Sequence, residues 1–173
     1  MWTNVGFYLK MENFLSTEKV VHLRKKNIEK FRKDRIMFTH DTQTRVRYGE
    51  TDQMGYLYYG TYALYYEIGR AEMIRSLGLS YKHMETELGI MMPVMSLQMR
   101  FVRPALYDEL VTIRATLREL PTSTITFHME LFNEKKKLLN GGSVKLCFVE
   151  MATNKTVAPP PYLIEKLSPF FKG

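Results

Sequence analysis

The sequence predicts an α+β fold in which an antiparallel sheet wraps around one long central helix. Segments in which apolar and polar residues alternate occur once before the helix and four times after it, a pattern typical of strands with one buried face. Between them, residues 61–77 have the period of a helix. Short connections between successive segments favour antiparallel pairing. A helix and a sheet with one apolar face bury these surfaces together when the sheet wraps the helix.

Each predicted strand carries its apolar or β-branched side chains on one face. The first strand covers residues 42–48, and four strands follow the helix. The inward-facing positions are Thr42, Thr44, Val46 and Tyr48; Met95, Leu97, Met99 and Phe101; Val111, Ile113, Ala115 and Leu117; Ile125, Phe127, Met129 and Leu131; and Val144, Leu146 and Phe148. The polar run at residues 133–137 predicts a hairpin turn, and residues 162–167 predict a short final helix.

The central helix is expected to run from Thr61, a suitable N-cap residue, to Leu77, with Gly78 just beyond its end. One face carries apolar residues and a glycine at spacings of three and four. These residues are Tyr62, Tyr66, Gly69, Met73 and Leu77. A glycine inside a helix costs about 1 kcal/mol relative to alanine. Gly69 therefore predicts that the helix approaches the sheet closely at this point.

The composition indicates a single globular domain. The chain has 173 residues, of which 45% are hydrophobic, and this is enough for a sizeable core. No apolar run approaches the length of a transmembrane segment. The N-terminal residues lack the charged region and the cleavage site of a secretory signal. Cys147 is the only cysteine, which excludes an internal disulfide and fits a reducing, cytoplasmic location.

The positive charge is concentrated at the N-terminus. The formal net charge is +7, and residues 1–36 contain nine Lys and Arg against four Asp and Glu, a net +5. This shift predicts a basic N-terminal extension over residues 1–36 and a main domain over residues 37–173, with Met37 as a candidate start of the protein. No pattern of aromatic and basic residues accompanies the extension, so nucleic acid is not an expected partner.

The loop before the central helix carries the strongest functional signal. It contains Glu50, Thr51 and Asp52, and it leads to a helix start whose first backbone N–H groups are unpaired. A carboxylate can attack a carbonyl carbon or deprotonate a water molecule, and N–H groups can stabilise a carbonyl oxygen that becomes negative. The pattern is compatible with acyl transfer, although the residues alone favour a turn-forming role for these polar side chains.

The run from Tyr48 to Tyr62 resembles the signature of the hotdog-fold acyl-CoA thioesterases of the 4-hydroxybenzoyl-CoA thioesterase type. It is also similar to the Tol-Pal-associated acyl-CoA thioesterases. In the resembled family an aspartate at the position of Asp52 is followed after two residues by a glycine, here Gly55, and then by aromatic residues and a helix. The resemblance covers about residues 38–165. It implies a hotdog fold and the hydrolysis of an acyl-CoA to a carboxylic acid and free CoA, without a cofactor.

The resemblance also implies roles for individual residues. Asp52 matches the catalytic carboxylate and would act as nucleophile or as general base, and the sequence does not choose between these routes. The backbone amides of Tyr59 and Gly60 are expected to polarise the thioester carbonyl at the helix start. The other carboxylate of the loop, Glu50, is interpreted as a turn residue.

Gly55, Tyr58 and Glu67 are further candidates, as substrate-binding residues. The tyrosine side chains near the helix start also suit simple packing. Glu67 lies three residues before Arg70, a spacing that favours a structural ion pair. The functional alternative is that Glu67 helps to position a water molecule or Asp52.

Two other functions stay open. A hotdog hydratase or dehydratase relies on a histidine in its active-site loop, and no histidine lies between His40 and His83. Some thioesterase relatives carry a histidine at the position of Tyr59, so a histidine-assisted variant is disfavoured here. The four histidines lack the spacing of metal ligands, and no metal site is expected. The second alternative is a non-catalytic protein that binds acyl-CoA or acyl carrier protein, or a scaffold.

The expected partner is an acyl-CoA or an acyl carrier protein thioester. Arg100, Arg103 and Lys145 are candidates for contacts with the phosphates of CoA. Proteins of the resembled family generally form dimers whose sheets join, with the site at the dimer interface, and tetramers of such dimers are common. The resemblance therefore implies a homodimer or a homotetramer.

Overall fold

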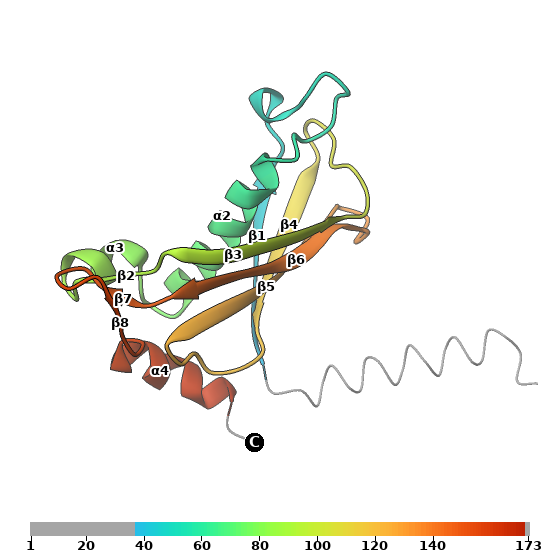
Figure 1. Cartoon of the computed structure of the whole chain (residues 1–173). Coiled ribbons are helices and arrows are strands. Elements are labelled where there is room, and N and C mark those ends of the chain that lie inside the picture. The colour runs from blue at the N-terminus through green and yellow to red at the C-terminus, as the bar shows by residue number, and fades with distance from the viewer. Residues whose placement is uncertain (1–36, 172–173) are drawn as a thin grey trace, which may run out of the picture. The chain divides into compact units, whose positions relative to one another are not determined.

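The computed structural model describes residues 37–171 (Figure 1). The predicted N-terminal extension lies outside this range, so the boundary at residue 37 stays a prediction. The helices of the described part are α2 (Thr61–Ser76), α3 (Tyr81–Thr86) and α4 (Pro161–Leu167), with 3₁₀ turns η1 (Tyr48–Glu50) and η2 (Ser168–Phe170). The strands are β1 (Phe38–Arg45), β2 (Ile90–Met91), β3 (Val94–Phe101), β4 (Leu110–Leu117), β5 (Thr124–Phe132), β6 (Leu138–Cys147), β7 (Val149–Glu150) and β8 (Lys155–Thr156).

Within residues 37–171, five strands form one antiparallel sheet in the order β1-β4-β5-β6-β3. The short strands β2, β7 and β8 form a second sheet. Helix α2 packs on one face of the larger sheet, mainly over β1 and β4, and the strands curve around it (Figure 1). The described residues therefore have the predicted architecture of an antiparallel sheet around one long helix.

The predicted apolar face of α2 is the face that packs on the sheet. The residues Tyr62, Tyr66, Gly69, Met73 and Leu77 are all buried. At Gly69 an added Cβ would lie 2.5 Å from Ile113 Cγ2 and 2.7 Å from Met129 Cε. Both distances are well below van der Waals contact, so the absence of a side chain is what allows the helix to lie this close to the sheet. The close approach predicted from Gly69 is confirmed.

The alternation predicted for β4, β5 and β6 is also confirmed. The inward side chains Val111, Ile113, Ala115, Leu117, Ile125, Phe127, Met129, Leu131, Val144 and Leu146 are buried. The predicted hairpin turn joins β5 to β6. There the Asn133 carbonyl accepts from the Lys136 N–H (2.8 Å), and the Asn133 side-chain oxygen accepts from the Lys137 N–H (2.9 Å).

The segment before α2 leaves the sheet earlier than predicted. Strand β1 spans Phe38–Arg45, and the chain then turns through η1, where the Glu50 N–H donates to Arg47 O (3.0 Å). Tyr48, for which the alternation predicts an inward position, is 80% exposed as a result. The alternation in the sequence continues beyond the end of the strand. In a 3₁₀ turn, however, alternate side chains do not share one face, so the pattern no longer indicates which side chains are buried.

Strand β6 is longer than predicted. It begins at Leu138, whereas the alternation is visible only from residue 143 onward. Gly141 and Gly142 interrupt the apolar pattern in between. An added Cβ at Gly142 would collide with the Gln98 carbonyl oxygen of β3, so the neighbouring strand requires a glycine there.

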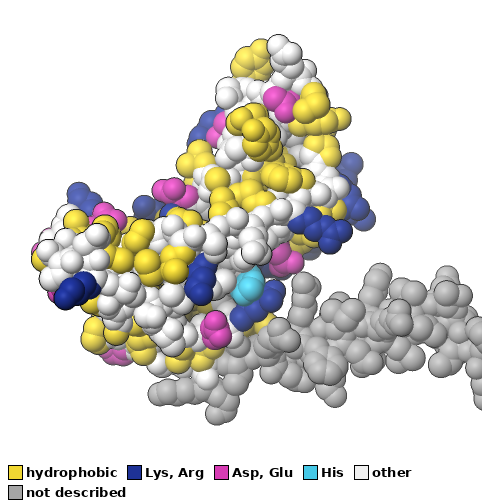
Figure 2. Space-filling model, in the orientation of Figure 1, with side chains coloured by type: hydrophobic (Ala, Val, Ile, Leu, Met, Phe, Trp, Pro, Cys, Tyr) yellow, Lys and Arg dark blue, Asp and Glu magenta, His cyan; other side chains and the backbone are white. Residues whose placement is uncertain are grey.

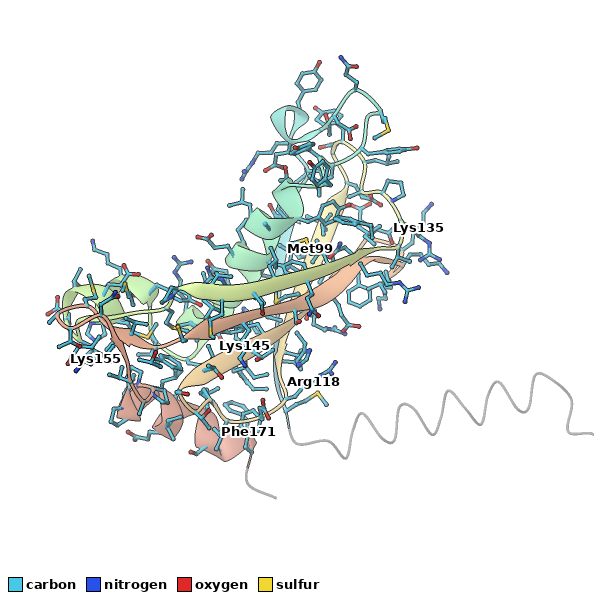
Figure 3. All side chains as sticks on the ribbon, viewed as in Figure 1. Met99, Arg118, Lys135, Lys145, Lys155 and Phe171 are labelled. Carbon is cyan, nitrogen blue, oxygen red and sulfur yellow. The ribbon has the colours of Figure 1, made fainter. Side chains whose placement is uncertain are left out.

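Strands β3 and β4 do not form the hairpin that short connections favour. Strand β3 pairs with β6 and lies at the edge of the sheet. Its predicted core face is largely uncovered, because Met95, Leu97 and Phe101 are 58%, 42% and 52% exposed. Figure 3 shows Met99 on the side of β3 that faces α2 and Lys145 of β6 on the opposite side, and Met99 packs partly buried against the core. The predicted faces are correct, but α2 lies mainly over β1 and β4, at the edge of the sheet away from β3.

Short elements account for most of what the sequence pattern missed. Helix α3 and strands β2, β7 and β8 carry too few residues for a clear period. Ser80, which caps α3 by accepting from the His83 N–H (3.1 Å), was a usable signal. The predicted final helix is confirmed as α4, and Gly78 follows α2 with a φ of 80°, as expected beyond a helix end. No helix within residues 37–171 is long and apolar enough to cross a membrane.

The close packing at Gly69 predicts an unusual response to substitution. Alanine is favoured over glycine in helices, yet Gly69→Ala is expected to lower the free energy of unfolding by about 1–3 kcal/mol, because the methyl group overpacks against Ile113 and Met129. Urea denaturation measures this change. Gly49→Ala is the control, because an added Cβ there has no heavy atom within 4 Å. A stabilised Gly69→Ala variant would contradict the packing.

Candidate active site

The loop between η1 and α2 is closed by its own backbone hydrogen bonds. The Asp52 N–H donates to Tyr56 O (2.8 Å), and the Gly55 N–H donates to Asp52 O (2.9 Å). Gly55 has a φ of 74°, a conformation that glycine adopts without the steric cost that a Cβ brings. No heavy atom lies within 4 Å of the Cβ position. The backbone conformation, rather than space, explains a glycine at residue 55.

The Asp52 side chain takes part in the turn with only one of its two oxygens. Asp52 Oδ1 accepts from the Met54 N–H (2.9 Å) and from the Tyr56 N–H (3.3 Å). Within residues 37–171, Oδ2 has no hydrogen-bond donor. The turn-forming interpretation is therefore correct for one oxygen, and it holds the carboxylate in place while the other oxygen is available to a reactant.

The start of α2 offers unpaired backbone donors. The helix begins at Thr61 and the N-cap position is Gly60, so Thr61 is not the cap residue that the sequence predicted. The Thr61 N–H donates to Tyr58 O (2.9 Å). In the described part of the chain, the backbone N–H groups of Tyr59 and Gly60 have no acceptor. An added Cβ at Gly60 would lie 2.7 Å from a Tyr58 ring carbon, so a glycine lets that ring lie against the helix start.

A cleft of about 340 Å³ brings parts of the predicted site together. Its lining residues are Asp52, Met54, Tyr56, Leu57, Tyr59, Tyr62, Phe101, Val102, Arg103 and Pro104. Asp52 and Tyr59 thus share one cavity whose other walls are mostly apolar or aromatic. Figure 2 shows apolar side chains gathered along the front of the molecule, from the loop before α2 to the face crossed by β3. Such a cleft can hold an apolar group next to a carboxylate.

The other four predicted site residues, Gly55, Tyr58, Gly60 and Glu67, lie outside the lining of this cleft. Gly55 shapes the turn, and the Tyr58 ring packs against the Tyr59 ring with 4.5 Å between ring centroids. Glu67 is largely exposed, with a carboxylate oxygen 3.9 Å from Arg70 Nη2. This is the ion pair that the spacing of three residues favours.

The aromatic wall that Tyr62 and Phe101 form in the cleft was not predicted from the sequence. The rings of Tyr62 and Phe101 meet edge to face with 5.1 Å between centroids. The Tyr62 hydroxyl accepts from the Ala105 N–H (3.4 Å), and burial raises the pKa of Tyr62. Both residues were assigned to apolar faces, but only the fold shows that the end of β3 meets the first turn of α2. Arg103 also lines the cleft while its guanidinium donates to Leu138 O (2.9 Å).

The interpretation of Glu50 as a turn residue is incomplete. Its side chain is only 13% exposed. The carboxylate accepts from the hydroxyl of Tyr65 on α2 (2.8 Å) and from the backbone N–H of Arg47 (2.9 Å). The sequence offered no signal for the first contact, because a spacing of 15 residues across a loop has no period. Among residues 37–171, no cluster of three or more His, Cys, Asp or Glu side chains is placed to hold a metal ion.

Comparisons with known proteins show the family and the fold of this chain. The chain matches the thioesterase superfamily over residues 54–140, just over half of its length. The acyl-CoA thioesterase YbgC of Haemophilus influenzae is 28% identical over 116 residues, covering 67% of this chain and 85% of YbgC. A solved structure of DHNA-CoA thioesterase from Staphylococcus aureus is 32% identical with a TM-score of 0.71, covering 76% of this chain and 89% of that one. A mutant 4-hydroxybenzoyl CoA thioesterase complexed with 4-hydroxybenzoyl CoA shares the fold, with 19% identity and a TM-score of 0.68 over 75% of this chain and 98% of that one.

The chain belongs to the thioesterase superfamily. The predicted hotdog fold is confirmed by the structural likeness, and the predicted enzyme class, thioester hydrolase, is confirmed by the family match and the relatives. The family match begins at Met54, two residues after Asp52. It therefore does not include the candidate carboxylate, whose role stays a prediction.

The φ of Gly55 leads to a testable expectation. Gly55→Ala is expected to lower the free energy of unfolding by about 1–2 kcal/mol, because a Cβ is disfavoured in the left-handed region. Gly55→Asn should lower the free energy of unfolding by less, since asparagine tolerates this conformation. Thermal unfolding of the three proteins measures the difference. Equal losses in both variants would show that a contact, rather than the backbone angle, requires glycine.

Proposed function

We propose that this enzyme hydrolyses acyl-CoA thioesters, with Asp52 as nucleophile or general base. The observation that carries the proposal is that Asp52 and Tyr59 line the same apolar cleft, next to a helix start with unpaired N–H groups. A carboxylate and amide donors around one cavity are the groups that thioester hydrolysis requires. The relatives support CoA as the carrier, because YbgC is named an acyl-CoA thioesterase and the staphylococcal protein acts on DHNA-CoA.

Two chemical routes fit the carboxylate. In the first, Asp52 Oδ2 attacks the carbonyl carbon, the C–S bond breaks, and CoA leaves as a thiolate that takes a proton from solvent. Water then hydrolyses the mixed anhydride and restores Asp52. In the second, Oδ2 removes a proton from a water molecule and the resulting hydroxide attacks the carbonyl carbon. The C–S bond then breaks, and the proton passes from Asp52 to the leaving thiolate. Both routes end in a carboxylic acid and free CoA, and the fixed Oδ1 orients the carboxylate in either.

The backbone N–H groups of Tyr59 and Gly60 would stabilise the carbonyl oxygen. This oxygen becomes negative as the carbonyl carbon is attacked, and preorganised donors are worth most at that stage. The positive end of the dipole of α2 acts in the same direction. Because these donors belong to the backbone, the tyrosine ring at residue 59 need not take part in the chemistry.

The walls of the cleft suit the other parts of the substrate. Tyr56, Tyr62 and Phe101 offer aromatic surface to the acyl group. Arg103 stands among the lining residues as a cation that can meet a phosphate of CoA. An acyl carrier protein thioester presents a phosphate through its prosthetic arm as well, so it belongs in the substrate panel as the competing carrier.

A homodimer joined along β3 is the expected assembly. Strand β3 is an edge strand with unpaired backbone groups. Its exposed apolar residues, together with the residue that follows it, are Val94, Met95, Leu97, Phe101 and Val102. An apolar surface of this kind favours association. Phe101 and Val102 also line the cleft, so a second copy placed on β3 would help to enclose the substrate.

Replacement of Asp52 tests the catalytic assignment. Both Asp52→Asn and Asp52→Ala are expected to lower kcat by at least about 100-fold, the lower end of the contribution of a general base. Thiol release from short-, medium- and aromatic-acyl CoAs, and from an acyl carrier protein thioester, measures turnover. Urea denaturation should show that both variants stay folded. Wild-type turnover in either variant would refute the role of Asp52, and saturable binding without thiol release by the wild-type protein would indicate a binding protein.

The assembly is tested at Leu97. Leu97→Lys places a charge on the exposed apolar face of β3, and the protein is expected to elute as a monomer with at least a tenfold loss of turnover if the partner completes the cleft. Gln98→Lys is the matched control, because it adds the same charge to the opposite face of the same strand. Light scattering after gel filtration measures the mass. A monomeric wild-type protein, or a dimeric Leu97→Lys variant, would contradict this interface.

A further inference from the structure

Glu50 is a carboxylate that the loop turns inward. Its Oε2 accepts from the Tyr65 hydroxyl (2.8 Å) and the Arg47 backbone N–H (2.9 Å), while Oε1 lies 3.4 Å from Arg47 Nη1. A carboxylate that loses most of its water needs such donors to offset its desolvation. The Arg47 side chain is itself mostly exposed. The contact with Tyr65 is therefore the least exposed of the three.

Tyr65 ties this carboxylate to the helix that carries the N–H donors. It lies one turn after Thr61 on α2 and is fully buried. Burial, followed by the hydrogen bond to Glu50, raises the pKa of Tyr65 well above its ordinary value. The hydroxyl therefore keeps its proton and acts as a donor to Glu50.

The backbone of Glu50 holds the other end of the loop. Its carbonyl oxygen accepts from the backbone N–H of Tyr58 (2.8 Å). Tyr58 is the residue just before Tyr59. Asp52 lies two residues beyond Glu50, within the same closed segment. One residue thus fixes the start of the loop to α2 through its side chain and the end of the loop through its backbone.

We propose that Glu50 and Tyr65 are positioning residues that set the separation between the Asp52 carboxylate and the N–H groups of Tyr59 and Gly60. The proposal rests on the proposed function, because it assigns a purpose to the geometry of that site. Neither Glu50 nor Tyr65 lines the cleft, so their action is through the loop and not on the substrate. An error of about 1 Å in the placement of reacting groups can cost about 100-fold in rate.

Tyr65→Phe removes the hydroxyl and keeps the ring. We expect kcat to fall by roughly 10- to 100-fold while KM changes by less than about 2-fold, because transition-state geometry is lost and substrate binding is not. Tyr66→Phe is the matched control. The Tyr66 hydroxyl is also buried and donates to Asn140 Oδ1 (2.5 Å), but it does not contact the loop. Its loss should lower stability by a similar amount and leave kcat within about 2-fold of the wild type.

Variants of Glu50 distinguish the effect on kcat of its hydrogen bond with Tyr65 from the effect of its negative charge. Glu50→Gln keeps an oxygen that can accept from Tyr65, so kcat is expected to stay within about 3-fold of the wild type. Glu50→Ala should lower kcat by at least as much as Tyr65→Phe, because it also removes the acceptor of the Arg47 N–H. The kcat of the double variant Glu50→Ala/Tyr65→Phe should fall no further than that of Glu50→Ala, because the contact between Tyr65 and Glu50 is already absent from Glu50→Ala.

Hydrogen–deuterium exchange of the full chain gives a readout that does not depend on turnover. The backbone amides of residues 52–58 should exchange faster in Tyr65→Phe than in Tyr66→Phe, because the Tyr58 N–H bond to Glu50 O loosens. Wild-type kcat in Tyr65→Phe, or equal losses of kcat in both tyrosine variants, would overturn the proposal. If Asp52→Asn is inactive in that case, only the positioning role fails. If Asp52→Asn keeps wild-type turnover, the proposed catalytic role of Asp52 is wrong. Unchanged hydrogen exchange in Tyr65→Phe would reject the positioning role independently of turnover.

Discussion

The packing of α2 on the sheet is the contact on which the rest of this structure depends. Without a side chain at Gly69, the helix lies directly against Ile113 and Met129. One turn earlier, Tyr66 forms a buried hydrogen bond with Asn140 of β6. The close packing at Gly69 sets how near the helix lies to the sheet, and the first turn of the helix lies beside the end of β3. The cleft exists at that junction, and a shift of the helix would change both its aromatic wall and its N–H donors.

The two carboxylates of the loop, Glu50 and Asp52, have different surroundings. Glu50 and Asp52 are separated by one residue, yet Glu50 is turned toward α2 and bonded on both sides, whereas Asp52 lines the cleft with one oxygen unpaired among the described residues. A largely covered carboxylate with several donors is held in one position. A carboxylate at a cavity is available to a reactant. In our proposals, Glu50 positions the loop, and Asp52 acts as nucleophile or general base.

Strand β3 links the fold to the site in another way. Its apolar face extends past the part of the sheet that α2 covers, and it ends at Phe101, which belongs to the cleft. The Phe101 side chain thus belongs both to the exposed surface and to one wall of the cavity. In the assembly that we propose, a second copy placed on β3 would cover Phe101 and with it part of the wall of the cleft.

Much of the fold and part of the site could be predicted from the sequence. The period of residues in β4, β5 and α2 determined which faces are buried, and Gly69 determined where the helix touches the sheet, because these patterns are local. The resemblance of the loop pointed to Asp52, and Gly55 indicated a turn. Only the tertiary structure decided that β3 pairs with β6, that Phe101 meets Tyr62, and that Glu50 meets Tyr65. These contacts join residues from different elements, and neither period nor spacing along the chain specifies which elements become neighbours.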